Sequence, residues 1–257
     1  MKILSIGNSF SQNAQRYVHK ISVLNGKPIK TVNLYIGGCS LRRHYFNILE
    51  NSKDYEFQFN GEPTGLKVTA KDVLMSDSWD YVTFQQASQC STSWDTYTPY
   101  LPALSEYAKK YAPESKQLIH QTWQYSQQLT TERKMGNSPE EMHEKLCDAY
   151  AKAKKLISAD GIIPSGELVS TLIKNGIPCP HSDGYHLGRG AGQLAVGLLW
   201  YSYFTGDNPL EVILPGTDLP VTEEEIEIIR KSVAEVLTSK QLKKDTAAVC
   251  AVISKRS

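Results

Sequence analysis

Ser9, Asp183 and His186 belong to the residue types that cooperate in nucleophilic hydrolysis. A serine hydroxyl is a weak nucleophile until a base takes its proton, and histidine is the side chain best suited to do so near neutral pH. Asp183 stands three residues before His186, so one loop turn can bring its carboxylate to the imidazole and hold the productive tautomer. Each residue alone has a simpler explanation, since serine and aspartate are common helix caps. Together they predict a catalytic triad with Ser9 as the nucleophile.

Negative charge that develops on a substrate oxygen in such a reaction needs hydrogen-bond donors. Ser9 lies where a helix is expected to begin, and the first N–H groups of a helix have no partner within it. Gly38 follows the second expected strand, and Gln85-Gln86 stands at the end of the third. We therefore expect the Ser9 and Gly38 N–H groups and one side-chain amide to form an oxyanion hole. Strand alternation lets only one glutamine face the site, and Gln85 is favoured over Gln86 because it is last in the strand.

Most of these residues follow short apolar segments that predict the strands of one sheet. The segments are Lys2–Ile6, Ile29–Ile36, Asp80–Gln85, Gln117–Thr122 and Gly161–Pro164. Helical patterns lie between or after them, over 14–24, Leu101–Tyr111, Pro139–Ile157, Gly188–Tyr203 and Glu223–Leu237. This alternation predicts right-handed crossovers and a mostly parallel sheet. We expect a three-layer α/β/α, flavodoxin-like fold with five strands in the order 2-1-3-4-5 and the reactive residues at the carboxyl ends of the strands.

A hairpin is expected before the third strand, because the residues on both sides of Asn60-Gly61 alternate between apolar and polar. We expect it to be a small insertion on the surface. The chain has 257 residues, 40% of them hydrophobic, and suits one globular domain over 1–239. Residues 240–257 form a polar C-terminal tail that we expect to be poorly ordered.

Four sequence blocks together resemble the SGNH (GDSL-like) hydrolases, over roughly residues 2–205. They are Gly7-Asn8-Ser9 after the first strand, Gly38 after the second, Gln85-Gln86 after the third and Asp183-Gly184-Tyr185-His186 near the end. Glutamine replaces the asparagine that is usual in the third block. The chain looks closest to a bacterial branch with Gly-Asn-Ser-Phe, Gly-Gly-Cys-Ser-Leu and Gln-Thr-Trp, found here at 7–10, 37–41 and 121–123. The resemblance implies a serine esterase that needs no cofactor and cleaves short O-acyl esters, acetyl above all, of carbohydrates.

Aromatic residues after the third and fourth strands are candidates for contact with a sugar ring. Trp94, Trp123 and Tyr125 could stack on substrate or could belong to the core, and the sequence leaves both explanations open. The same loops contain few aliphatic residues, which disfavours a long acyl chain. Two alternatives stay open: a hydrolase of lysophospholipids or acyl thioesters, and a non-catalytic sugar-binding module on a flavodoxin-like scaffold.

Other reactive side chains and the overall charge argue against further partners. His181 stands two residues before Asp183, but no third ligand at a suitable spacing supports a metal site. Cys39 has no adjacent base and is expected to be a small buried thiol rather than a nucleophile. The formal net charge is +1 and the Lys and Arg residues are scattered, so neither nucleic acid nor an anionic membrane is an expected partner.

No apolar run approaches the roughly 18 residues of a membrane helix, and no basic segment with a cleavage site precedes the first strand. A cytoplasmic location is the default expectation, and an extracytoplasmic one applies if a signal peptide has been removed. The expected partner is a small-molecule or oligosaccharide ester. The sequence leaves the oligomeric state open.

Overall fold

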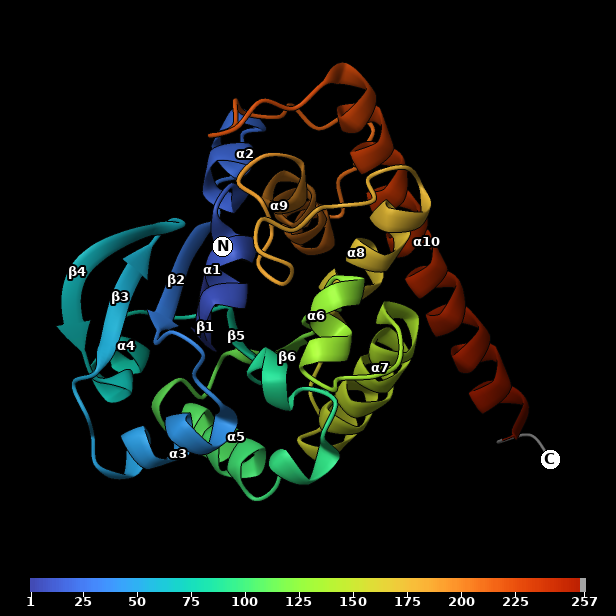
Figure 1. The fold of residues 1–257 in the computed structure, drawn as a ribbon. Helices are drawn as coiled ribbons and strands as arrows, with labels where there is room; N and C mark the ends of the chain where they lie inside the picture. Colours follow the sequence, from blue (N-terminus) through green and yellow to red (C-terminus); the bar gives the residue numbers. More distant parts are fainter. Residues whose placement is uncertain (255–257) are drawn as a thin grey trace.

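A central sheet organises the computed structural model, which describes residues 1–254, with side chains described through 239. Within this part of the chain the sheet has seven strands in the order β4-β3-β2-β1-β5-β6-β7 (Figure 1). The strands are β1 (Lys2–Gly7), β2 (Lys30–Tyr35), β3 (Tyr55–Phe59), β4 (Glu62–Val68), β5 (Tyr81–Phe84), β6 (Lys116–His120) and β7 (Gly161–Ile163).

Five of these strands run parallel, and they confirm the predicted topology. Strand β1 pairs in parallel with both β2 and β5, and β6 pairs in parallel with β5 and β7. The resulting order, β2-β1-β5-β6-β7, is the expected 2-1-3-4-5. Every residue of β1 after Lys2 is buried, because helices cover both faces of a parallel sheet.

The predicted hairpin is not a separate surface insertion but the edge of the same sheet. Strand β3 pairs antiparallel with β2, with Val32 opposite Phe59, and β4 pairs antiparallel with β3. The turn between them uses positive φ at Asn60 (51°) and Gly61 (83°). A Cβ on Gly61 would lie 2.7 Å from the Gln15 carbonyl oxygen, so only glycine allows the turn to pack against the adjoining helical segment.

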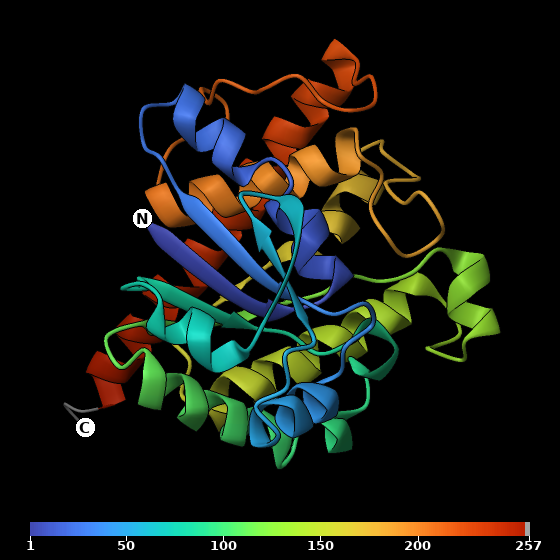
Figure 2. The same ribbon diagram turned by 90° about the vertical axis from the view of Figure 1, so that its left-hand side faces the viewer.

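Helices form a layer on each side of the sheet (Figures 1 and 2). One layer contains α1 (Ser9–Gln15), α2 (Val18–Leu24), α8 (Ser165–Lys174), α9 (Ala191–Thr205) and α10 (Glu223–Ser254), which pack on one another. The other contains α3 (Leu41–Leu49), α4 (Ala70–Met75), α5 (Tyr100–Tyr111), α6 (Gln127–Glu132) and α7 (Pro139–Leu156). Helix α9 is apolar on all sides and almost wholly buried, as expected of a helix enclosed by its neighbours.

Two helix boundaries differ from the sequence expectations. The pattern over 14–24 is divided into α1 and α2, which are separated at Arg16 and Tyr17, although α1 begins at Ser9 as expected. Helix α9 begins at Ala191 instead of Gly188. The backbone of α10 continues to Ser254, whereas the side chains of the predicted tail, 240–257, lie outside the described residues.

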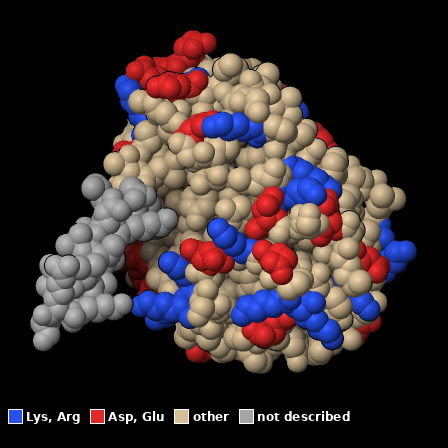
Figure 3. Space-filling model, turned by 180° about the vertical axis from the view of Figure 1, so that it is seen from behind, with Lys and Arg blue, Asp and Glu red and all other residues tan. Residues whose placement is uncertain are grey.

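The described surface mixes charges of both signs. On the face drawn in Figure 3, Lys and Arg side chains are interspersed with Asp and Glu. Among the residues that the structure describes, none of the helices combines the length and the apolar character that crossing a membrane requires.

Candidate active site

Ser9, His186 and Asp183 lie in one line of hydrogen bonds. The Ser9 Oγ is 2.8 Å from His186 Nε2, and His186 Nδ1 is 2.7 Å from Asp183 Oδ2. Because a carboxylate can only accept, Nδ1 carries the hydrogen and Nε2 is the ring nitrogen that can take the Ser9 proton. The arrangement matches the geometry that nucleophile, base and orienting group require.

The loop that carries Asp183 and His186 is fixed by its own backbone. Asp183 Oδ1 accepts the N–H groups of His186 (2.7 Å) and Tyr185 (3.2 Å). Partial burial opposes ionisation of this carboxyl, but the hydrogen bonds from His186 and Tyr185 outweigh it and lower the pKa of Asp183. The Leu187 N–H donates to Asn13 Oδ1 at 2.9 Å, so the loop is tied to the helix that begins with Ser9.

Asn8 and Gly7 set the position of Ser9. Asn8 caps α1 by accepting the Phe10 N–H at its Oδ1 (3.0 Å), which leaves Ser9 as the first helical residue. Gly7 is required by a close approach, since a Cβ there would lie 1.9 Å from Ser11 Oγ. Ser11 Oγ in turn accepts the Asn8 N–H at 3.1 Å. The turn from strand to helix is therefore closely packed directly before Ser9.

A second turn, after β2, faces Ser9. Gly38 has φ of +61°, a conformation that favours glycine. The turn is held by Asn8 Nδ2, which donates to the Cys39 carbonyl at 3.1 Å, and by Gln89 Nε2, which donates to the Gly38 carbonyl at 3.3 Å. The Ser9 and Gly38 N–H groups have no acceptor among the described residues. Both residues line one hollow of about 460 Å³.

The two glutamines of the third block do not reach this hollow, which differs from the expectation for the oxyanion hole. Gln85 Nε2 donates to Asn8 Oδ1, and its Oε1 accepts from His120 Nδ1 at 2.6 Å. Gln86 Oε1 accepts the Leu41 N–H at 2.9 Å. Its Nε2 donates to the Thr96 carbonyl oxygen and to the Thr96 hydroxyl oxygen, each at 3.0 Å. Both side chains are fully buried. Their polar atoms bond to neighbouring protein groups, because buried polar groups need partners, and neither side chain lines the hollow.

Gln85 instead belongs to a buried chain of side chains that ends at Asn8. Trp200 Nε1 donates to Ser165 Oγ (3.3 Å), Ser165 Oγ to His120 Nε2 (3.1 Å), and His120 Nδ1 to Gln85 Oε1. Burial lowers the pKa of His120 to about 3, so the ring is neutral and its two nitrogens have fixed roles. Asn8 Oδ1 accepts the Phe10 N–H, and an amide oxygen can only accept, so Gln85 Nε2 must donate to it. Gln85 Oε1 therefore accepts from His120 Nδ1, and His120 Nε2 accepts from Ser165.

The hollow also contains residues outside the predicted triad and oxyanion hole. Its lining is Asn8, Ser9, Phe10, Tyr35, Gly37, Gly38, Ser88, Gln89, Arg133, Tyr185 and His186. Ser88 is notable because its Oγ accepts from Tyr125 Oη at 2.7 Å, which leaves its own hydrogen available. Phe10 and Tyr185 adjoin triad residues in the chain, and Tyr35 ends β2; adjacency to the motifs was the one signal that could have identified them.

The three aromatic residues that were candidates for substrate contact lie outside the lining of the hollow. Trp123 and Tyr125 are fully buried, whereas Trp94 is half-buried and packs on Tyr97, with ring centroids 5.2 Å apart. Two of them support the hollow from behind. Trp123 Nε1 donates to the Tyr185 carbonyl at 2.7 Å, and its ring lies 4.4 Å from that of Phe10.

Two other side chains that could be reactive, Cys39 and His181, are buried. Cys39 is fully buried, and burial raises the pKa of its thiol to about 12, which disfavours a nucleophilic thiolate. His181 Nε2 donates to the Gln124 carbonyl at 3.0 Å, and burial lowers the pKa of this histidine. The described residues contain no group of His, Cys, Asp or Glu side chains that could hold a metal ion.

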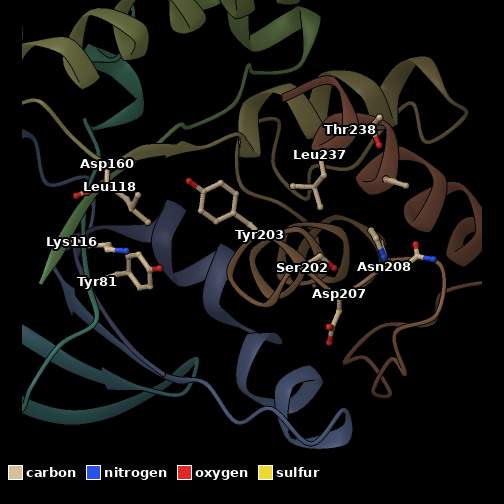
Figure 4. Close-up of a pocket in the computed structure, with 13 residues that line it drawn as sticks. Tyr81, Lys116, Leu118, Asp160, Ser202, Tyr203, Asp207, Asn208, Leu237 and Thr238 are labelled. Atoms are coloured by element: carbon tan, nitrogen blue, oxygen red, sulfur yellow. The ribbon is translucent and has the colours of Figure 1, made fainter. Parts of the chain in front are cut away.

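A larger cavity of about 610 Å³ lies at the other end of the sheet (Figure 4). It is bounded by Tyr81 and Lys116 at the starts of β5 and β6, by Tyr203 of α9 and by Leu237 of α10. None of the residues singled out for chemistry lies in its lining. In a parallel sheet, reactive groups belong at the carboxyl ends of the strands, and the smaller hollow occupies that end.

Comparison with known proteins places this geometry in context. The model of the family described as "Domain of unknown function (DUF4886)" matches residues 2–213. A DUF4886 family protein from Bacteroides uniformis superposes with a TM-score of 0.86 at 30% identity, over 93% of this chain and 95% of that one. A candidate SGNH hydrolase from Slackia heliotrinireducens gives 0.56 at 22% identity, over 79% and 98%. A candidate GDSL-like lipase from Parabacteroides merdae gives 0.54 at 14% identity, over 80% and 95%. No curated protein matches the sequence.

Proposed function

Because the chain belongs to the DUF4886 family and has the fold of the SGNH hydrolases, we propose that it is a serine esterase with Ser9, His186 and Asp183 as its catalytic triad. One observation carries the proposal: the line of hydrogen bonds runs from Ser9 through His186 to Asp183 beside a hollow. Ser9 and Gly38 line this hollow, and their backbone N–H groups have no acceptor among the described residues. Nucleophile, base, orienting carboxylate and anion-binding donors are the parts that acyl transfer needs.

The reaction follows from the roles of these atoms. Ser9 Oγ attacks the ester carbonyl while His186 Nε2 takes its proton, and the tetrahedral oxygen accepts hydrogen bonds from the Ser9 and Gly38 N–H groups. His186 then returns the proton to the departing alcohol as the carbon–oxygen bond breaks. Water repeats the sequence on the acyl-enzyme and releases the acid. Asp183 stays ionised and stabilises the imidazolium that forms.

Ser88 is the side chain that we propose as the third oxyanion donor, in place of Gln85 or Gln86. It lines the hollow, and its hydroxyl hydrogen is free because Tyr125 supplies the bond that its oxygen accepts. Ser88→Ala should lower kcat on the order of a hundredfold with little change in KM. Ser91→Ala is the matched control, since that buried hydroxyl donates to the Ser88 carbonyl and does not line the hollow. Equal kcat in the two variants would exclude Ser88.

The direct test of the nucleophile is labelling with a fluorophosphonate. We expect stoichiometric reaction in the wild type, with the adduct on the peptide that contains Ser9, and no reaction in Ser9→Ala. Ser9→Ala and His186→Ala should each remove nearly all esterase activity, and the double variant should be little worse, because triad members act as a unit. An adduct elsewhere, or more than about a tenth of the turnover in Ser9→Ala, contradicts the assignment.

For the substrate, we propose a small acyl group, acetyl above all, on a hydroxylated alcohol such as a sugar. The hollow is lined by glycine, polar side chains and the rings of Phe10, Tyr35 and Tyr185, and its lining contains no aliphatic side chain. A longer acyl chain would find no aliphatic wall there, so each added methylene would lack the burial that is worth about 0.8 kcal/mol. We expect kcat/KM to fall steeply from acetyl to butyryl to octanoyl esters of one alcohol. Octanoate equal to acetate would favour a lysophospholipase or thioesterase, and a sugar bound without turnover would favour a binding module.

A further inference from the structure

Arg133 is the one permanently charged side chain in the lining of the hollow. It follows α6 directly, as the C-cap residue, and its guanidinium lies 5.1 Å from the ring centroid of Tyr185 and 5.9 Å from that of Tyr125. Cation–π contact with two rings holds a guanidinium in place without using its N–H donors. The side chain is therefore positioned and still able to bind a ligand.

No anion within the described part of the chain neutralises Arg133. Its guanidinium takes part in no hydrogen bond or ion pair there, and the lining of the hollow contains neither Asp nor Glu. Arg16 shows the usual alternative, because it is bonded to Glu62 and Asp218. A guanidinium offers a planar fork of donors that matches a carboxylate in two parallel hydrogen bonds.

The location of Arg133 indicates which part of a substrate it would meet. The Tyr185 ring, beneath the guanidinium, also lies 3.9 Å from the imidazole of His186. His186 must give its proton to the departing alcohol, so the alcohol leaves beside this ring. The acyl oxygen would instead accept from the N–H groups of Ser9 and Gly38. Arg133 therefore stands on the alcohol side of the scissile bond.

We propose that Arg133 binds a carboxylate on the alcohol portion of the ester, so that the substrate is an O-acylated hydroxy acid, such as an acylated acidic sugar. This inference rests on the proposed esterase function. It adds that the charge of the leaving alcohol, in addition to the length of the acyl chain, determines kcat/KM.

The test uses two acetate esters of matched shape, those of 4-hydroxybenzoate and of 4-hydroxybenzamide. A charge-assisted bond of this kind favours the carboxylate by about tenfold to a hundredfold. We expect Arg133→Gln to lower the ratio of the two kcat/KM values, anionic over neutral, by at least tenfold, and Arg133→Lys to retain part of it. Intrinsic reactivity of the two esters cancels because only the ratio is compared between variants.

Lys134→Gln is the matched control, because it removes the same charge from the next residue, which is exposed and lies outside the lining. We expect it to leave the ratio unchanged. Equal ratios in wild type and Arg133→Gln, or an equal loss in Lys134→Gln, overturn the proposal. If neither ester is hydrolysed faster than by Ser9→Ala, the esterase function fails instead.

Calorimetric binding of 4-hydroxybenzoate keeps the inference testable without turnover. In the Ser9→Ala background we expect its affinity to fall at least tenfold on Arg133→Gln and not on Lys134→Gln. The affinity for 4-hydroxybenzamide should not respond to either change. Equal affinity of both variants for 4-hydroxybenzoate would show that Arg133 does not bind the carboxylate.

Discussion

The two oxygens of Asp183 have separate partners. Oδ1 accepts two backbone N–H groups, those of Tyr185 and His186, while Oδ2 accepts the hydrogen on His186 Nδ1. The backbone therefore fixes how the carboxylate is turned, and the turned carboxylate fixes the tautomer of the imidazole. An asparagine side chain at position 183 would be oriented by the same two N–H groups.

We predict that Asp183→Asn abolishes catalysis by reversing the imidazole. Its carbonyl oxygen would take the Oδ1 position, so its NH2 group would face Nδ1 and force the hydrogen onto Nε2. Nε2 could then no longer accept the Ser9 proton, and kcat should fall by about a thousandfold to ten-thousandfold. Thermal unfolding should be nearly unchanged, because the backbone hydrogen bonds remain. Turnover above a tenth of the wild-type value would show that the carboxylate does not set the tautomer.

The start of α1 is the structural element on which the nucleophile depends. It is capped by Asn8, and Asn8 is held through Gln85 by a chain that reaches β6, α8 and α9. Among the residues whose side chains the structure describes, Gln85 alone links that chain to the cap. A glutamine suits this role because its amide accepts from His120 and donates to Asn8 at the same time.

We predict that Gln85→Leu lowers kcat by about tenfold to a hundredfold, with a smaller change in KM, because Ser9 would lose its fixed position. The free energy of unfolding should fall by about 1–3 kcal/mol, since His120 Nδ1 keeps a hydrogen without an acceptor.

Gln117→Leu is the control. Gln117 is also buried and makes two hydrogen bonds to Ser105, but it lies near the start of β6, outside the lining of the hollow. This variant should lose similar stability and keep kcat. An equal fall in kcat in Gln85→Leu and Gln117→Leu would show that Gln85 affects catalysis only through the stability of the fold.

Two histidines are fully buried and neutral in the folded protein. His44, in α3, and His120, in β6, are both fully buried, and burial lowers the pKa of each to about 3. The unfolded chain binds a proton on each of them below about pH 6.5, whereas the folded chain does not until about pH 3. Acid therefore favours unfolding throughout this window.

We predict that the free energy of unfolding falls as the pH is lowered from about 6.5, by about 1.4 kcal/mol per pH unit for each histidine. His44→Phe preserves the stacking on Tyr55 and removes one titrating group, so the slope between pH 4.5 and 6 should decrease by about 1.4 kcal/mol per pH unit. Denaturant titrations at several pH values measure it. An unchanged slope would mean that His44 binds its proton equally well in the folded state.

Local patterns in the sequence were enough for the parallel sheet and for the grouping of Ser9, Asp183 and His186. Strands that alternate with helices predict a mostly parallel sheet, and a parallel sheet puts the residues after each strand at one edge. Asp183 and His186 are three residues apart, so their hydrogen bond forms within one loop. Alternation on both sides of Asn60-Gly61 predicted a hairpin, but pairing with β2 is a contact at long range that the pattern does not encode.

The direction of each buried side chain was decided by the tertiary structure. Gln85 and Gln86 directly follow the third parallel strand, which ends at Phe84, yet buried neighbours supply partners for both amides and direct them away from the hollow, because a buried polar group without a partner is costly. Arg133 reaches the hollow only when α6 packs next to the loop of Tyr185, 52 residues later in the chain. The sequence by itself therefore determines which residues can carry out the chemistry, while packing decides which of their neighbours meet the substrate.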